Sequence, residues 1–124
     1  MCGIFFYKGK LYKTDDLTYY VEKLNDRGPD NKKIVQVSDD IILGFTRLCI
    51  NDLSEAGDQP FHKNGIYLIC NGEIYNFKQL IDENQFQMNS SSDCEVIIDL
   101  YLKYGLKKTC EQLDGVFSFV IVDT

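Results

Sequence analysis

The second residue of the chain, Cys2, is the side chain best suited to nucleophilic chemistry. A small second residue usually permits removal of the initiator methionine, which would leave Cys2 with a thiol and a free α-amine. The thiolate is the reactive form of cysteine, and an unperturbed thiol has a pKa of about 8.5. An α-amine titrates near ~7.7–8.0, so at neutral pH a usable fraction is an unprotonated base. Cys2 is therefore either a nucleophile that carries its own general base or a small apolar residue that opens a strand.

Arg47 and the segment Asn71-Gly72-Glu73 could bind charged or polar groups of a ligand. The guanidinium of Arg47 follows an apolar run and could hold a carboxylate through two hydrogen bonds, or form a structural salt bridge. Asn71-Gly72 indicates either a hairpin turn or a pair of amide donors for an oxyanion. Glu73 and Asp93 could each receive an ammonium group, or be a solvated loop acid and an acid at a helix start.

Strands and helices follow one another in an order that favours layered sheets and helices over a doubly wound fold. Apolar runs predict strands at 2–7, 34–37, 41–45, 65–70 and 116–122. Periodicity predicts helices at 14–25, 77–83, 92–104 and 106–113. The expected helix-end signals are Thr14 as an N-cap, a capping box at Ser92–Glu95 and Gly105 as a C-cap. Residues 51–64 are predicted to form a long irregular connection, and such loops are usually functional or disordered.

The composition, 44% hydrophobic and 26% charged over 124 residues, is that of one ordinary globular domain. The net charge of −6 and the absence of long Lys/Arg runs disfavour nucleic-acid and membrane partners. Five widely spaced cysteines without Cys-x-x-Cys, and the single His62, do not predict a metal site. With no signal-peptide or membrane-span pattern, we expect a cytoplasmic domain with free thiols.

Several motifs occur together, in one order, along essentially the whole chain. They are Met1-Cys2-Gly3-Ile4, Arg27-Gly28-Pro29-Asp30, Arg47–Leu53 with Gly57 and Gln59-Pro60, Asn71-Gly72-Glu73-Ile74-Tyr75-Asn76, Ser92–Glu95 and Leu113–Phe119. On these motifs the sequence resembles the class II glutamine amidotransferases, and most closely the glutaminase domain of glutamine-hydrolysing asparagine synthetase. The six-residue match at Asn71–Asn76, together with a cysteine in second position, is the most specific part of the resemblance.

The resemblance implies an α/β (α+β) N-terminal-nucleophile hydrolase fold: four layers, αββα, with two packed and mostly antiparallel sheets. It implies that Cys2, once Met1 is removed, attacks the side-chain amide of L-glutamine, and that Asn71 and Gly72 form the oxyanion hole. The other implied substrate contacts are Arg47 for the α-carboxylate, Glu73 and Asp93 for the α-ammonium, and backbone groups of Leu48, Ile50 and Asn51.

The resemblance also sets expectations about partners and cofactors. Family glutaminase domains continue for longer, so residues 1–124 are expected to form an incomplete glutaminase domain with an open sheet edge, able to form a homo-oligomer. We expect no cofactor in this domain, and ATP and Mg²⁺ only in a synthetase domain that this sequence does not include. The expected role is to supply ammonia for asparagine synthesis through a synthetase domain or subunit. Two alternatives stay open: amidotransfer to another acceptor through a partner, and a non-catalytic interaction or regulatory module.

Overall fold

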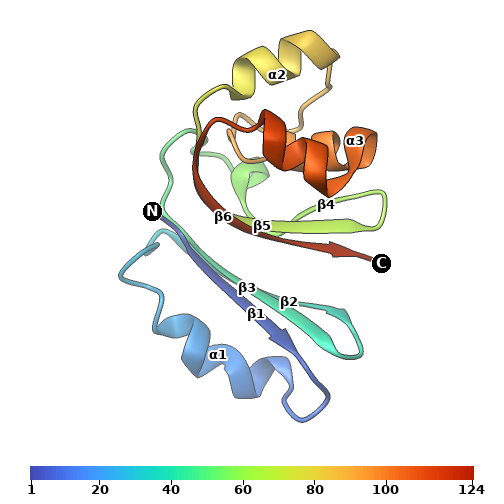
Figure 1. Cartoon of the computed structure of the whole chain (residues 1–124). Helices are drawn as coiled ribbons and strands as arrows, with labels where there is room; N and C mark the ends of the chain where they lie inside the picture. Colours follow the sequence, from blue (N-terminus) through green and yellow to red (C-terminus); the bar gives the residue numbers. More distant parts are fainter.

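The computed structural model describes residues 1–124 and has four layers, in the order helix, sheet, sheet, helices (Figure 1). Helix α1 (Thr14–Glu22) covers a sheet of β1 (Gly3–Lys8), β3 (Ile41–Arg47) and β2 (Asn31–Ser38), in that order. The second sheet contains β4 (Phe61–Lys63), β5 (Ile66–Ile74) and β6 (Gly115–Asp123), in that order. Helices α2 (Phe77–Asn84) and α3 (Val96–Gln112) cover its outer face, and a short 3₁₀ helix, η1 (Glu55–Gly57), precedes β4. All strand pairs are antiparallel, so the predicted αββα architecture is confirmed.

Strand β5 contributes to both apolar cores because its side chains alternate between the two faces of the sheet. Ile69 packs between the sheets with Leu43 and Phe45, and the partly buried Cys2 joins this cluster. Leu68 and its neighbours on the opposite face pack under α2 and α3. Residues 70–74, which follow in β5, therefore lie close to the start of β1.

Strand β5 continues through Asn71-Gly72 to Ile74 and pairs with β6 along its whole length. The hairpin-turn interpretation of Asn71-Gly72 is therefore wrong, as is the predicted end of this strand at Cys70. A Cβ atom at Gly72 would lie 2.3 Å from the carbonyl oxygen of Val116, so the glycine serves the close approach of β6 rather than a turn.

The structure differs from three local predictions. Strand β4 lies within 51–64, which the sequence predicts to be irregular. The N-cap of α1 is Lys13 rather than Thr14. The capping box at Ser92–Glu95 does not form: α3 begins at Val96, and the Glu95 carboxylate accepts from the amides of Asn89 and Ser90, at 2.9 and 2.8 Å.

Gly105 interrupts α3 with a φ of 79°, at the predicted end of the first helical segment. Left-handed backbone of this kind favours glycine. None of the helices is both long and apolar enough to cross a bilayer.

Candidate active site

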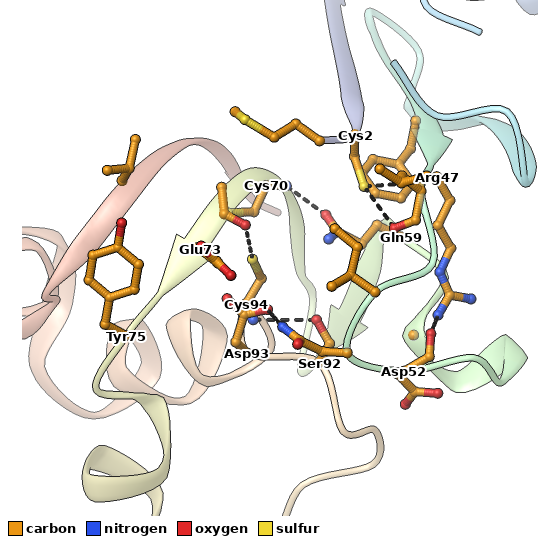
Figure 2. A pocket seen from close by; sticks show the side chains of 18 residues that line it. Cys2, Arg47, Asp52, Gln59, Cys70, Glu73, Tyr75, Ser92, Asp93 and Cys94 are labelled. Carbon is orange, nitrogen blue, oxygen red and sulfur yellow. Dashed lines mark hydrogen bonds between the residues drawn. The ribbon is translucent and has the colours of Figure 1, made fainter. Parts of the chain in front are cut away.

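All candidate residues except Asn71 line one cavity of about 320 Å³ (Figure 2). The N-terminal segment provides Cys2, and the end of β3 with the connection after it provides Arg47, Leu48, Ile50 and Asn51. Strand β5 provides Gly72 and Glu73, and the segment before α3 provides Asp93. The cavity therefore gathers four separate stretches of sequence around the Cys2 thiol.

The Cys2 thiol is half-buried and contacts the backbone of Leu48. The Leu48 amide donates to Cys2 Sγ at 3.3 Å, and Sγ lies 3.7 Å from the Leu48 carbonyl oxygen. Burial raises the pKa of the Cys2 thiol, and the Leu48 amide, the α-ammonium of Met1 and Arg47 offset this only in part. The thiol is therefore protonated at neutral pH and needs a base. Neither histidine nor lysine lines the cavity, and His62 lies at a separate depression.

The loop Arg27–Asp30 positions the N-terminal segment and the end of β3. Arg27 Nε donates to the Cys2 carbonyl oxygen at 3.3 Å, and the Asp30 carboxylate accepts from the Cys49 amide at 2.8 Å. A Cβ atom at Gly28 would lie 2.3 Å from the Thr46 carbonyl oxygen, so only glycine allows the loop to pack this closely. The Arg-Gly-Pro-Asp motif thus holds Cys2 against the strand end that leads to Leu48.

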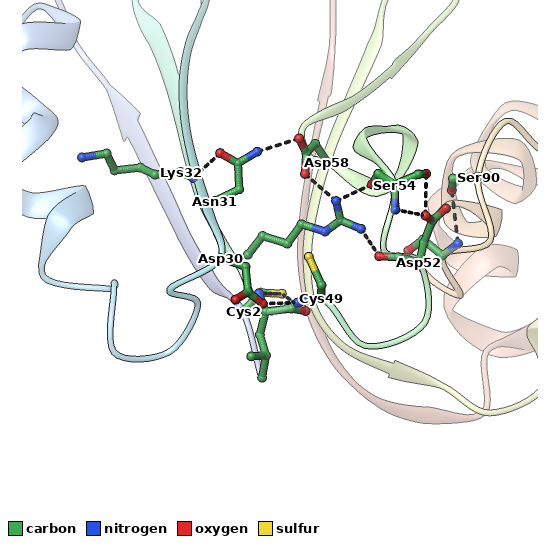
Figure 3. Close-up of polar contacts among 12 residues, drawn as sticks. Cys2, Asp30, Asn31, Lys32, Cys49, Asp52, Ser54, Asp58 and Ser90 are labelled. Atoms are coloured by element: carbon green, nitrogen blue, oxygen red, sulfur yellow. Dashed lines mark hydrogen bonds and ion pairs between the residues drawn. The ribbon is translucent and has the colours of Figure 1, made fainter.

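Arg47 is 6% exposed, and its guanidinium is held by the loop that follows it. Nη1 donates to the Ser54 carbonyl oxygen and to Asp58 Oδ1, each at 2.6 Å, and Nη2 donates to the Asp52 carbonyl oxygen. Asn31 of β2 in turn fixes Asp58 at 2.6 Å (Figure 3). A guanidinium has five N–H donors, so Nε–H and one Nη2–H of Arg47 keep no protein acceptor. These two N–H groups can lie side by side, so they can donate to the two oxygens of one carboxylate.

The amide of Gly72 is the one free donor on the cavity edge of β5. Beyond Leu68 this edge has no β4 partner. The Cys70 amide donates to Gln59 Oε1 and the Ile74 amide to Asp93 Oδ2, each at 2.6 Å. Amides of alternate residues point to the same edge of a strand, so the Gly72 amide points the same way and lies between these two. It can donate to an oxygen in the cavity.

Replacing Gly72 with alanine is expected to destabilise the fold by about 1–3 kcal/mol, as overpacking does. The new Cβ would lie 2.3 and 2.5 Å from backbone atoms of Val116 and Phe117. Gly105→Ala is the matched control, because Gly105 also has a positive φ but has no atom within 4 Å of the built Cβ. Chemical denaturation should show the larger loss for Gly72→Ala; equal losses would contradict a close-approach role.

Asp93 is buried and faces the cavity with both carboxylate oxygens fixed. Oδ1 accepts from Asn51 Nδ2 at 2.8 Å, and Oδ2 accepts from the Ile74 amide. Each oxygen keeps a further lone pair, so the group can still receive an ammonium. Glu73 also lines the cavity, exposed and without an ion pair, and adds negative charge at the same end.

Asp52 connects the loop after β3 to the turn before Asp93. Its Oδ1 accepts from the amide and hydroxyl of Ser54, at 2.7 and 2.5 Å, and its Oδ2 accepts from the Ser91 amide at 2.7 Å. These hydrogen bonds lower the pKa of the Asp52 carboxyl, the Ser54 side chain most of all. Two walls of the cavity are therefore joined by an ionised carboxylate.

This junction is expected to hold at neutral and mildly acidic pH. Because the folded pKa of Asp52 is depressed, its stabilising effect is present above the unfolded value of about 3.9 and is lost as pH falls through the folded pKa. Following the Ser91 amide by NMR during acid titration should give a midpoint below that of a free aspartate. A midpoint at or above the free value would contradict the junction.

Cys70 and Cys94 also line the cavity but are not suited to act as nucleophiles. Both are buried, and Cys94 Sγ lies 3.9 Å from the Gly72 carbonyl oxygen. The neighbouring Cys70 thiol and burial raise the pKa of Cys94 strongly. All five cysteines are free thiols, and no group of three or more His, Cys, Asp or Glu side chains could hold a metal ion.

Asn71 is the one candidate residue that the structure keeps out of the cavity lining. Its side chain shares the face of β5 with Ile69, and its Oδ1 is buried without a hydrogen-bond partner. Conversely, sequence reasoning assigned no role to Gly57, Asp58 or Gln59, which position Arg47 or line the cavity. Their only signal is the motif Gly57…Gln59-Pro60 within a long irregular loop.

Comparisons with known proteins agree with this geometry. Residues 1–124 match the family model described as the glutamine amidotransferase domain. The chain is 43% identical over 130 residues to a probable asparagine synthetase [glutamine-hydrolyzing] of Acanthamoeba polyphaga mimivirus, covering 99% of this chain and 24% of that protein. It is 36% identical over 129 residues to the asparagine synthetase [glutamine-hydrolyzing] of Gallus gallus, covering 100% of this chain and 23% of that protein.

Two further matches widen the comparison. Amidase chyE of Penicillium rubens is 40% identical over 113 residues, covering 88% of this chain and 16% of that protein. The solved structure of glutamine phosphoribosylpyrophosphate amidotransferase from B. subtilis superposes with a TM-score of 0.77 at 24% identity, over 97% of this chain and 35% of that one. This last likeness concerns the fold. The chain spans less than a quarter of the length of the three curated relatives.

Proposed function

Because the chain belongs to the glutamine amidotransferase domain family, we propose that it hydrolyses L-glutamine to glutamate and ammonia through a thioester on Cys2. The observation that carries the proposal is the cavity itself. One thiol faces a free backbone amide, a guanidinium with two open donors and a buried carboxylate. These are the groups needed to bind a zwitterion at both of its charges and to attack its side-chain amide.

The nucleophile is the Cys2 thiol, and the base is its own α-amine once Met1 is removed. The raised thiol pKa requires a base, and an α-amine titrating near ~7.7–8.0 is suited to neutral pH. Met1 lines the cavity, so its removal also enlarges the space beside Cys2. The Cys2 carbonyl stays anchored by Arg27, which keeps the new N-terminus in place.

Substrate binding follows from the charges at the cavity walls. The open Nε and Nη2 donors of Arg47 hold the α-carboxylate, and Asp93 and Glu73 hold the α-ammonium. Backbone groups around Leu48, Ile50 and Asn51 line the space between. A neutral amide side chain can then extend toward Cys2.

The proposed steps use the groups of this cavity and one water molecule. Cys2 Sγ bonds to the side-chain carbonyl carbon while its proton passes to the α-amine, and the oxyanion accepts from the Gly72 amide. The protonated α-amine of Cys2 then gives its proton to the leaving nitrogen of the substrate amide. The C–N bond breaks, and ammonia departs. Water adds to the thioester, and the thiol is restored as glutamate leaves. We assign the second oxyanion donor to Asn71, whose side chain must rotate into the cavity for this role.

The ammonia is proposed to supply asparagine synthesis through a synthetase domain or subunit that receives it. The two asparagine synthetases matched over 99–100% of this chain support this acceptor. A second candidate is transfer to a different acceptor held by a partner, and the 40% identity to amidase chyE, a relative not named a synthetase, favours it.

The experiment is a glutamate-release assay on the chain with Met1 removed, with Cys2→Ala as control. Saturable glutamate formation that is lost in Cys2→Ala supports hydrolysis at this site. Glutamate formation that is equal in both proteins would contradict it, as would a complete absence of turnover from a correctly processed and folded chain.

A further inference from the structure

Gln59 presents a hydrogen-bond donor to the cavity that the mechanism above does not use. Its side chain is 4% exposed and lines the cavity between Cys2 and Asp93 (Figure 2). Its Oε1 accepts from the Cys70 amide at 2.6 Å. Because that contact requires an acceptor, the carbonyl oxygen must face Cys70, and the Nε2 group must face away from it.

The Nε2 group has no protein partner. It donates to no group of the chain, yet it is not among the sealed polar atoms that lack a partner, which are Asn71 Oδ1 and Asp99 Oδ2. It is therefore not sealed inside the protein, and Gln59 lines the cavity. Water can pair with this donor in the free protein, and a ligand oxygen that reaches it can take the place of that water.

The ligand group that pairs with it must be an oxygen. The substrate ammonium has no lone pair, and the lone pair of the amide nitrogen is delocalised into the carbonyl. Neither nitrogen can therefore accept a hydrogen bond from Nε2. In the proposed mechanism the reacting carbonyl is placed between Cys2 Sγ and the Gly72 amide. The α-carboxylate has two oxygens with about four acceptor sites, whereas Arg47 has only two donors left after its bonds to Ser54, Asp58 and Asp52.

The position of Gln59 suits the carboxylate end. It lines the cavity together with Arg47, and both residues also line a second, small depression with Asp58, the acid that fixes the Arg47 guanidinium at 2.6 Å. On the basis of the proposed glutamine hydrolysis, we propose that Gln59 is a specificity-determining residue whose Nε2 donates to the substrate α-carboxylate beside Arg47.

The test is Gln59→Glu, which keeps the shape and an acceptor for the Cys70 amide but replaces the donor with a negative oxygen. With L-glutamine, KM is expected to rise on the order of 10- to 100-fold, the range that corresponds to losing a hydrogen bond to a charged group, with kcat little changed. With 4-aminobutanamide, which has no α-carboxylate, kcat/KM should not fall. Gln36→Glu, the same charge change at an exposed position of β2, should leave both substrates unaffected.

Equal losses for both substrates would overturn the proposal, because they would mean that Gln59 acts only by supporting the Cys70 amide and β5. An unchanged KM for L-glutamine would overturn it as well. If Gln59→Glu does not fold, Gln59→Met must show the same dependence on the substrate. Equilibrium binding of L-glutamine to the Cys2→Ala protein, with and without Gln59→Glu, separates this proposal from catalysis. Absence of turnover in the wild-type chain bears on the proposed function alone.

Discussion

A chain that keeps Met1 is expected to hydrolyse L-glutamine at least about 10²-fold more slowly than a chain that begins at Cys2, the usual contribution of general acid–base catalysis. Retained Met1 converts the α-amine of Cys2 into an amide, which cannot take the thiol proton. The thiol itself has a raised pKa because it is half-buried, and no histidine or lysine of the cavity can replace the amine.

The comparison requires two preparations of the same chain: one released by a protease so that Cys2 is first, and one released with Met1 in place. The processed chain should show a rate that rises with pH through a pKa near ~7.7–8.0, and the other chain should not. Equal kcat values and equal pH profiles would contradict the role of the α-amine. Cys2→Ala, processed in the same way, sets the background rate.

Replacing Arg47 with methionine is expected to lower the free energy of unfolding by about 3–5 kcal/mol, the range for breaking a buried pair. The change leaves the Asp58 carboxylate, whose side chain is 13% exposed, without its guanidinium. Adding Asp58→Leu should recover much of the stability, because the unpaired charge is then removed as well. Urea denaturation of the two proteins measures the difference.

The same pair of variants separates stability from substrate binding. KM for L-glutamine should rise in Arg47→Met and should stay raised in the double variant, since neither restores a cation for the α-carboxylate. Recovery of both stability and KM in the double variant would contradict a direct contact between Arg47 and substrate.

The layered fold could be predicted because the local signals and the tertiary structure agree along most of the chain. The strand pair 34–37 and 41–45 appears as β2 and β3, and the helix break at Gly105 is present as φ of 79°. The prediction failed at Asn71-Gly72, because an Asn-Gly pair that usually makes a turn here continues a strand. The reason is the close approach of β6, which no local pattern records.

The cavity could be predicted only in part, for a related reason. Cys2, Arg47, Gly72 and Asp93 carry reactive or charged groups in recognisable motifs, and the fold gathers them. The roles of Asp52, Asp58 and Gln59 depend on contacts between a long loop and distant elements. Asp52 accepts from Ser91, 39 residues further along the chain, and Gln59 accepts from the Cys70 amide. A sequence pattern does not specify such pairings.

Intact mass spectrometry with an electrophilic glutamine analogue tests most directly whether Cys2 is an N-terminal nucleophile in a formed glutamine site. The expected mass lacks Met1 and gains a single adduct, which L-glutamine blocks and Cys2→Ala abolishes. The buried Cys70 and Cys94 should stay unmodified. Retained Met1, or adducts spread over Cys49 and Cys110 and unaffected by L-glutamine, would contradict the proposed site.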